Sequence, residues 1–152
     1  MRKTAAMGKP VTPLLTVDCV IVDARGRVLL IERGNEPFKG HYALPGGFVD
    51  LDETVEAACR REVKEETGLN PRRIRLIGVY SKPGRDPRGP TVSVAYLARV
   101  KAARAVAADD AVGTLWAAEW KRLGLAFDHK LIIRDALRLL AADQASAPKR
   151  TR

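Results

Sequence analysis

The segment 46–69, GGFVDLDETVEAACRREVKEETGL, concentrates carboxylates in a chain that is basic overall. It holds seven of the eighteen acidic residues, although the formal net charge is +9. Glu62, Glu65 and Glu66 follow one another closely, and a helical repeat of 3.6 residues would bring their side chains together. Carboxylate oxygens with no His or Cys nearby are the ligands that hard cations such as Mg²⁺ or Mn²⁺ prefer. The chemistry that this spacing suggests is therefore metal-assisted.

The same segment carries the start and stop signals of a helix. We predict a helix from about Glu53 to Thr67, with Asp50 or Asp52 near its N-cap. Gly68 follows it, and glycine is the usual residue at a helix C-terminus because it adopts a left-handed conformation without strain.

A helical wheel indicates which way the glutamates point. With an advance of 100° per residue, the face centred on Glu62 also contains Val55, Ala58, Cys59 and Glu66, with Glu65 at its edge. The opposite face holds Glu56, Arg60 and Lys64. The face with apolar residues is the one that packs inward, so we expect the acidic residues on it to point into the protein.

Inward-pointing carboxylates need a positive partner. Like charges at i and i+4 destabilise an exposed helix by about 0.2–0.5 kcal/mol, and burial increases that cost. Arg61 can pair with Glu65 at i and i+4. The remaining carboxylates indicate a bound divalent cation, the alternative being a solvated acidic helix.

Strand and helix patterns interleave along the rest of the chain. Apolar and β-branched runs predict strands at 14–23, 27–33, 72–82, 91–100 and 113–120, the first two joined in a hairpin by a turn at 24–26. Gly and Pro predict a loop at 34–47, with a short strand near 42–44, and a turn-rich connection at 83–90. The segment 128–144 predicts an amphipathic helix. This order predicts an α/β sandwich in one domain.

Composition is that of an ordinary globular domain. The 152 residues are 46% hydrophobic and 30% charged, and a chain of this length can bury a proper core. No apolar run has the length of a membrane span or of a signal peptide, so we expect no membrane association. Cys19 and Cys59 lack the spacing of a metal or redox motif, which favours reduced thiols and a cytoplasmic location.

Much of the positive charge lies near the two ends. Six basic residues there account for two-thirds of the net charge: Arg2, Lys3, Lys9, Lys149, Arg150 and Arg152. We expect basic tails at 1–11 and 145–152 around a domain at 12–144. Such tails usually solubilise a protein, so we do not expect direct nucleic-acid binding; a positive surface also attracts phosphate esters. A homodimer is left open.

The spacing within 47–69 resembles the signature of Nudix hydrolases, G-x5-E-x7-R-E-U-x-E-E-x-G-U, where U is a bulky aliphatic residue. Its fixed positions are met by Gly47, Glu53, Arg61, Glu62, Val63, Glu65, Glu66, Gly68 and Leu69. The preceding ALPGG at 43–47 and the hairpin before it are similar to the family as well. The resemblance extends over 12–142 and implies a Nudix-fold α/β/α sandwich with a central mixed sheet and a loop–helix–loop signature.

The resemblance implies hydrolysis of a nucleoside diphosphate linked to another moiety. It implies that Glu62, Glu65 and Glu66 ligate Mg²⁺ or Mn²⁺. It also implies that Glu53 and Arg61 hold the signature loop and orient a ligand carboxylate. The backbone of Gly46 and Gly47 would lie near the phosphates, since glycine permits a close approach.

Two groups are candidates for the base that activates water. One is Glu62. The other lies on the loop before Trp116, where similar proteins often supply an extra acid; Asp109 and Asp110 occur there, and we favour Asp110. The alternative for Asp110 is a plain turn residue.

Segments 81–96 and 127–137 resemble ADP-ribose pyrophosphatases of the family. In the first, Arg85 and Arg88 are candidates for contacts with phosphates or the terminal ribose, because arginine binds phosphate in a bidentate manner. The alternative is a solvated turn cluster with Asp86 as partner. Arg33 is a further candidate phosphate contact.

Aromatic residues and the histidine of the second segment have a structural interpretation. Phe127 and His129 precede the second helix, where we expect a capping or core role rather than substrate contact. Trp116 and Trp120 are expected in the core.

Three functions compete on this basis. The first is a Mg²⁺-dependent ADP-ribose pyrophosphatase that yields AMP and ribose 5-phosphate. The second is a hydrolase of nucleoside triphosphates, including oxidised dNTPs. The third is a non-catalytic transcriptional regulator that senses ADP-ribose. Such regulators usually have a degraded signature and an added DNA-binding domain. The signature here is complete and few residues follow the second helix, so we rank the regulator last.

Overall fold

The computed structural model describes residues 8, 10–101 and 111–147. Its strands are β1 (Leu14–Val22), β2 (Val28–Arg33), β3 (Tyr42–Ala43), β4 (Gly46–Phe48), β5 (Ile74–Tyr80), β6 (Thr91–Arg99) and β7 (Ala111–Ala117). Its helices are α1 (Val55–Thr67), the 3₁₀ helix η1 (Trp120–Arg122) and α2 (His129–Ser146). Every strand and helix predicted from the sequence is present.

The strands form one mixed sheet in the order β3-β2-β1-β6-β5. The central strand β1 runs antiparallel to β2, as the hairpin predicted, and parallel to β6 from Leu14↔Thr91 to Val22↔Arg99. Outside this path, β4 pairs with β1 and β7 pairs with β2. Since β1 is buried on both faces, its sequence reads as a nearly continuous apolar run rather than an alternating one.

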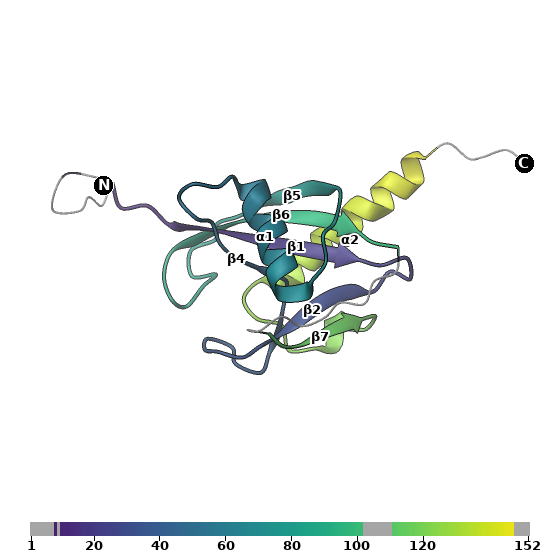
Figure 1. Ribbon diagram of the computed structural model, residues 1–152, viewed down its shortest axis with the longest axis horizontal. Helices are drawn as coiled ribbons and strands as arrows, with labels where there is room; N and C mark the ends of the chain where they lie inside the picture. Colours follow the sequence, from purple (N-terminus) through teal and green to yellow (C-terminus); the bar gives the residue numbers. More distant parts are fainter. Residues whose placement is uncertain (1–7, 9, 102–110, 148–152) are drawn as a thin grey trace, which may run out of the picture.

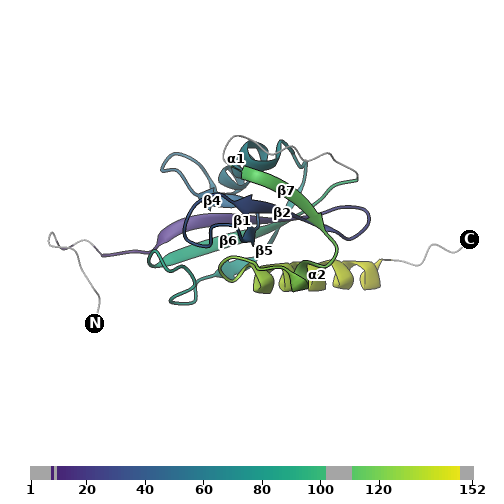
Figure 2. The ribbon, with the colours of Figure 1, turned by 90° about the horizontal axis from the view of Figure 1, so that it is seen from below.

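The two long helices cover opposite faces of the sheet (Figures 1 and 2). On the α1 side, Val17 and Ile21 of β1 pack with Cys59 and Val63 of the helix. On the α2 side, the core includes Val20, Leu30, Ile132 and Ile133, together with Trp120 as expected. This is the α/β/α sandwich that the sequence predicted. Trp116 is half-buried against the α1-side core.

The start of α1 differs from the prediction. Thr54 is the N-cap, and its hydroxyl accepts the N–H of Ala57 at 3.1 Å. Asp50 and Asp52 are not caps, because Glu53 accepts the Asp50 N–H at 3.0 Å and so forms a turn ahead of the helix. Gly68 ends the helix as predicted, in a left-handed conformation with φ of 71°.

Two further boundaries were wrong. The sequence predicted a loop at 34–47 because of its glycines and prolines, but Gly46 and Gly47 belong to the short strand β4, which pairs with β1 through Val17↔Gly47. Helix α2 runs from His129 to Ser146 and so ends two residues beyond the predicted end at 144. Among the described residues, no helix is both long enough and apolar enough to traverse a lipid bilayer.

Candidate active site

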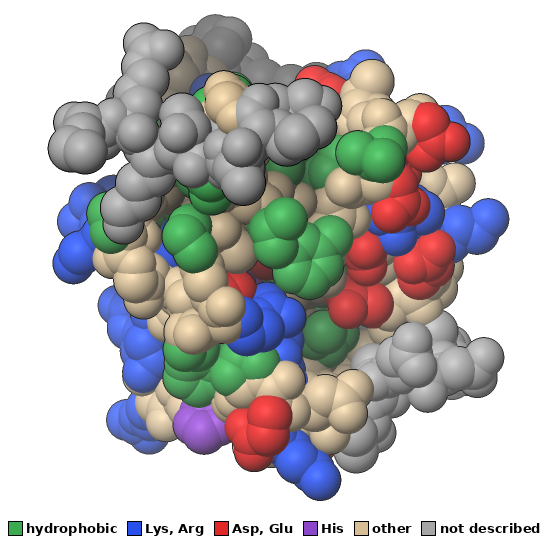
Figure 3. All heavy atoms as spheres, turned by 90° about the vertical axis from the view of Figure 1, so that its left-hand side faces the viewer, with side chains coloured by type: hydrophobic (Ala, Val, Ile, Leu, Met, Phe, Trp, Pro, Cys, Tyr) green, Lys and Arg blue, Asp and Glu red, His purple; other side chains and the backbone are tan. Residues whose placement is uncertain are grey.

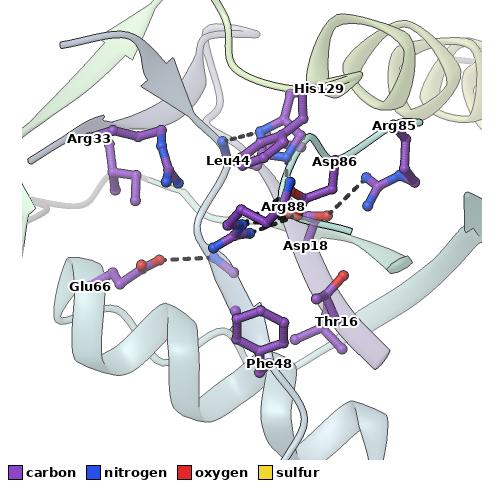
Figure 4. Close-up of a pocket in the computed structure, with 15 residues that line it drawn as sticks. Thr16, Asp18, Arg33, Leu44, Phe48, Glu66, Arg85, Asp86, Arg88 and His129 are labelled. Carbon is purple, nitrogen blue, oxygen red and sulfur yellow. Dashed lines mark hydrogen bonds and ion pairs between the residues drawn. The ribbon is translucent and has the colours of Figure 1, made fainter. Parts of the chain in front are cut away.

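A cavity of about 110 Å³ opens where β1, β4, the end of α1, the 85–88 loop and the start of α2 meet (Figure 4). Six residues singled out from the sequence as binding or metal residues line it: Arg33, Gly46, Gly47, Glu66, Arg85 and Arg88. Further lining residues had no predicted binding role: Thr16, Asp18, Phe48, Asp86, Phe127 and His129. The tertiary structure therefore brings Glu66 of the signature helix and the arginine candidates to one place. It does not bring Glu53, Arg61, Glu62 or Glu65 into the lining, and the Glu65 side chain is 57% exposed, so it does not point inward as expected.

Glu66 points from the end of α1 toward the Gly46 backbone (Figure 4). Its Oε2 accepts the Gly46 N–H at 2.8 Å. Burial raises the pKa of Glu66 to about 8; the Gly46 N–H opposes this rise, whereas the charges of Glu62 and Asp18 add to it. In the absence of a cation, this carboxyl therefore holds a proton over much of the neutral range.

Glu62 lies directly against Gly47. A Cβ atom at position 47 would lie 2.4 Å from Glu62 Oε1, so only glycine leaves room for this carboxylate. Burial raises the pKa of Glu62, and the neighbouring charges of Glu65 and Glu53 add to the rise while Arg61 opposes it. Gly46 is as restricted, since a Cβ there would lie 2.1 Å from the carbonyl oxygen of Val17. The double glycine thus allows the loop to pass between β1 and α1.

Arg61 joins the carboxylates of the signature. Its Nη2 lies 2.6 Å from Glu53 Oε1, and its Nη1 lies 2.8 Å from Glu62 Oε1 and 3.2 Å from Glu65 Oε2. The pair with Glu65 was predicted; the other two were not anticipated. Nη2 also donates to the carbonyl oxygen of Phe48 at 3.0 Å, which ties α1 to the end of β4. The hydrogen bonds that Arg61 donates to Glu53 and Glu62 raise its pKa, with Glu53 as the main cause.

The donor set of the signature suits a hard cation. Its candidate ligands Glu62, Glu65 and Glu66 offer only carboxylate oxygens. In the part of the chain described, however, no three acidic, His or Cys side chains already surround one point; Glu62 and Glu65 instead accept hydrogen bonds from Nη1 of Arg61. On the face in Figure 3, acidic side chains gather on one flank, and hydrophobic side chains separate them from a group of Lys and Arg. The metal assignment stays a prediction.

Arg33 enters the cavity from the end of β2 (Figure 4). Its Nε donates to the Pro37 carbonyl at 2.7 Å, and its guanidinium lies 5.0 Å from the centroid of the Phe127 ring. Burial lowers the pKa of Arg33, and the nearby charge of Arg88 adds to this. Among the described residues, no carboxylate forms an ion pair with Arg33, so its charge is available to an anionic ligand.

The other two arginines are already paired. Arg85 makes a bidentate contact with Asp128, at 2.6 Å from Nη2 and 3.0 Å from Nε, and its side chain is only 6% exposed. Arg88 pairs with Asp86 at 2.7 Å, which is the local partnership considered for it from the sequence. Arg85 therefore braces the 85–88 loop against the start of α2, and Arg88 lies at the cavity with its charge largely compensated.

Asp18 is the central site residue that sequence reasoning missed. It is 7% exposed, accepts a hydrogen bond from Ser93, and lies 3.3 Å from His129 Nε2 and 3.9 Å from Arg85. Burial alone would raise the pKa of Asp18, but His129, Ser93 and Arg85 together hold it below its usual value. An acid within the apolar run LLTVDCVIV was the available signal, since a buried charge requires partners.

The remaining predicted residues fall into two groups: two acids that lie outside the described residues, and two residues before or at the start of α2 that line the cavity. Asp109 and Asp110, the acids on the loop before Trp116, fall outside the described residues. His129 is 3% exposed and hydrogen-bonded, which agrees with the core role expected for it, although it also lines the cavity. Phe127 lines the cavity as well, with φ of 52°.

Comparisons with known proteins identify the family. The sequence model of the NUDIX domain family matches residues 12–139. The chain is 48% identical over 130 residues to the ADP-ribose pyrophosphatase of Methanocaldococcus jannaschii, covering 83% of this chain and 74% of that protein. It is 35% identical over 136 residues to the ADPR responsive transcriptional repressor NtrR of Acinetobacter baylyi, covering 82% of this chain but only 53% of the repressor.

Solved structures give the same result. The NUDIX domain of Shewanella oneidensis NrtR, complexed with ADP ribose, superimposes with a TM-score of 0.80 at 33% identity, covering 86% of this chain and 90% of that one. A bifunctional NMN adenylyltransferase/ADP ribose pyrophosphatase from Francisella tularensis, complexed with AMP and a Mn ion, has a TM-score of 0.73 at 30% identity, covering 84% of this chain and 42% of that one. With a match over most of its length and a complete signature on α1, the chain belongs to the NUDIX domain family.

Proposed function

We propose that the protein is a Mg²⁺- or Mn²⁺-dependent pyrophosphohydrolase that cleaves ADP-ribose to AMP and ribose 5-phosphate. The similarity to a pyrophosphatase named for this substrate, over most of both chains, supports the choice. The structural observation that carries the proposal is the position of Glu66. Its carboxyl is held on the Gly46 N–H in the same cavity as Arg33, so a metal-binding carboxylate and a phosphate-binding cation share one site.

Glu62, Glu65 and Glu66 are the residues that would hold the cation. When bound, Mg²⁺ or Mn²⁺ supplies Lewis acidity, screens the negative phosphates and acidifies a water molecule. Arg61 is the present partner of Glu62 and Glu65 through Nη1, whereas its Nε and Nη2 remain on Glu53. Arg61 can therefore release Glu62 and Glu65 and still anchor the signature loop through Glu53.

The protein's own groups account for binding and orientation. Arg33 offers its guanidinium to a phosphate of the substrate, and the aromatic face of Phe127 beneath it limits its movement. The glycines at 46 and 47 let the backbone approach the phosphates closely. Arg85 holds the 85–88 loop at the cavity through Asp128, a positioning role that replaces the direct phosphate contact considered for it.

Glu62 and Asp110 remain the candidates for the general base. The raised pKa of Glu62 favours this role, because a carboxylate with greater proton affinity is a better acceptor at neutral pH. Asp110 is the second candidate for the base. It lies outside the described residues, so measurements of activity on its variants test this role. Asp110→Asn distinguishes the two, because Asp110 is not among the candidate metal ligands. If Asp110 is the base, the variant loses most of its kcat while its affinity for Mg²⁺ is unchanged; if the variant keeps the parent's kcat, Glu62 is the base.

A substrate panel tests the proposal. We would measure kcat/KM with Mg²⁺ for ADP-ribose, other nucleoside diphosphate sugars, NADH, dNTPs and oxidised dGTP. The highest value is expected for ADP-ribose, with AMP and ribose 5-phosphate as products. A higher value for dGTP derivatives would favour the triphosphate hydrolase, and tight ADP-ribose binding without turnover would favour the regulator.

A further inference from the structure

A second concavity lies away from the catalytic cavity, between α1, the 70–73 loop, the far ends of β5 and β6, and α2. We call it the α1–β5–β6 groove. It encloses about 990 Å³ and is lined by Arg60, Asn70, Pro71, Arg72, Arg73, Ile74, Arg75, Leu97, Arg99, Val100, Lys101, Leu140 and Asp143. None of these residues lines the catalytic cavity.

Strand β6 separates the two sites. Near its start, Ser93 donates to Asp18 of the catalytic cavity, whereas Arg99 at its end lines the groove. A strand rises by about 3.3 Å per residue, so these two positions are about 20 Å apart. A ligand in the groove therefore need not obstruct the catalytic cavity.

The groove is strongly basic. Its lining includes six basic residues and a single acid, Asp143. Arg75 pairs with Asp143, and Arg60 donates to the carbonyl oxygens of Pro71 and Arg72, so that two of the six are used within the protein. The bonds of Arg60 also hold the loop that carries Arg72 and Arg73.

Four cations of the groove are available to a ligand: Arg72, Arg73, Arg99 and Lys101. All four are exposed, and none has a carboxylate partner among the residues that the structure describes. They come from two segments that are distant in the sequence, the 70–73 loop and the end of β6, and meet around one groove. Such an arrangement attracts an anion that carries several spaced phosphates, since one compact anion would neutralise only part of it.

The other lining residues restrict the kind of ligand. The apolar part of the lining is aliphatic, formed by Ile74, Leu97, Val100 and Leu140, and no aromatic ring is present in it. Proteins that read bases in single strands stack them on aromatic side chains. A lining of arginines without such rings suits contacts to phosphates, which carry no sequence information.

We propose that the α1–β5–β6 groove binds the phosphodiester backbone of a nucleic-acid strand, without base specificity and at a site separate from the catalytic cavity. This inference differs from the expectation from the sequence, which was that the protein does not bind nucleic acid directly. It stands apart from the proposed hydrolysis, since none of the four cations belongs to the catalytic machinery.

Fluorescence anisotropy with a labelled single-stranded RNA of about 20 nucleotides tests the proposal. We expect a dissociation constant of about 10⁻⁴–10⁻⁶ M that weakens steeply between about 50 and 200 mM salt. Four phosphate contacts to a single strand give a slope of log K against log salt of about −3. The variant Arg72→Ala/Arg73→Ala/Arg99→Ala should reduce the slope to about −1 and weaken binding by about tenfold or more.

Two matched variants separate the groove from net charge. Lys121→Ala/Lys130→Ala/Arg138→Ala removes the same charge from exposed positions of η1 and α2 that lie outside the groove lining, and should change binding by about twofold at most. Arg72→Lys/Arg73→Lys/Arg99→Lys keeps the charge and should retain binding. ADP-ribose turnover and melting temperature of all three variants should match the parent protein.

Several results would overturn the proposal. Equal loss of RNA binding in Arg72→Ala/Arg73→Ala/Arg99→Ala and in Lys121→Ala/Lys130→Ala/Arg138→Ala would indicate a net-charge effect. Loss confined to Lys149→Ala/Arg150→Ala/Arg152→Ala would assign binding to the C-terminal basic residues. Displacement of the RNA by saturating ADP-ribose would place it in the catalytic cavity, and equal affinity for inorganic phosphate would exclude a strand as the ligand.

Discussion

His129 Nδ1 accepts the backbone N–H of Leu44 at 3.0 Å, which connects the start of α2 to the loop that contains the double glycine. With Nδ1 accepting, the ring proton lies on Nε2, 3.3 Å from Asp18 Oδ1. Two residues further along the same loop, the Gly46 N–H donates to Glu66. The loop is therefore held by α2 on one side and by the signature helix on the other.

His129→Ala should destabilise the protein by about 1–3 kcal/mol, because the buried Leu44 N–H and the Asp18 carboxylate each lose a partner. Urea unfolding measures this change. His41→Ala is the matched control: His41 is exposed and should change the free energy of unfolding by about 0.5 kcal/mol at most. Equal effects of the two substitutions would contradict the bracing role of His129.

Glu66→Gln should lower kcat for ADP-ribose by about 100-fold or more at saturating Mg²⁺, since the amide removes a charge that the cation needs. The amide oxygen can still accept the Gly46 N–H, so the melting temperature should not fall. The measurement pairs steady-state kinetics with calorimetric titration of Mg²⁺. Turnover comparable to that of the parent protein would remove Glu66 from the metal site.

The metal-free protein should lose stability as the pH rises through neutrality. Burial raises the pKa of Glu66 from 4.5 to about 8, so the folded state favours the protonated carboxyl. The stability that this proton provides is fully present below pH 4.5 and is lost as the pH approaches 8. Urea unfolding between about pH 5.5 and 8.5 measures the change.

Two comparisons isolate the contribution of Glu66 to this pH dependence. Glu66→Gln should flatten it, leaving the smaller contribution of Glu62, whose pKa is also raised. Mg²⁺ should stabilise the parent protein more at high pH than at low pH, because the cation binds the ionised carboxylate. The same slope in the variant and the parent protein would contradict the assignment.

Gly47→Ala should reduce kcat/KM by about tenfold or more, because its Cβ would lie 2.4 Å from Glu62 Oε1 and displace that carboxylate. Gly113→Ala is the control: a Cβ at position 113 meets no atom within 4 Å. Neither glycine has a left-handed backbone, so strain does not confuse the comparison. Similar kinetics for the two variants would show that Glu62 tolerates displacement.

Arg85→Ala should destabilise the protein by about 3 kcal/mol, because it leaves the largely buried Asp128 without its bidentate partner. A double-mutant cycle with Asp128→Asn should reveal favourable coupling between the two side chains. Arg138→Ala, at an exposed position of α2, provides the baseline. Loss of ADP-ribose affinity with unchanged stability would instead favour direct substrate contact by Arg85.

Local chemistry explains how far prediction from the sequence could reach. The α1 helix follows from a 3.6-residue apolar pattern and a glycine stop, both of which depend on neighbouring residues. The exact start of α1 did not follow from the sequence. Glu53 lies before the first helical turn and accepts a hydrogen bond from Arg61, eight residues away. The strand β4 was missed because its stability comes from pairing with β1 rather than from strand-forming residues.

The sequence by itself determined the family, the order of the strands and helices other than β4 and η1, and the face of α1 that carries Glu62 and Glu66, because each of these rests on spacing within a short segment. Only the tertiary structure showed that Asp18 meets Ser93 and His129 at the candidate active site, and that Arg85 is paired with Asp128. It also showed that Arg33 has no carboxylate ion-pair partner among the residues described. Contacts such as Leu44–His129 join residues 85 positions apart. They arise when the sheet and both helices pack together, and no local periodicity records which distant side chains that packing brings into contact.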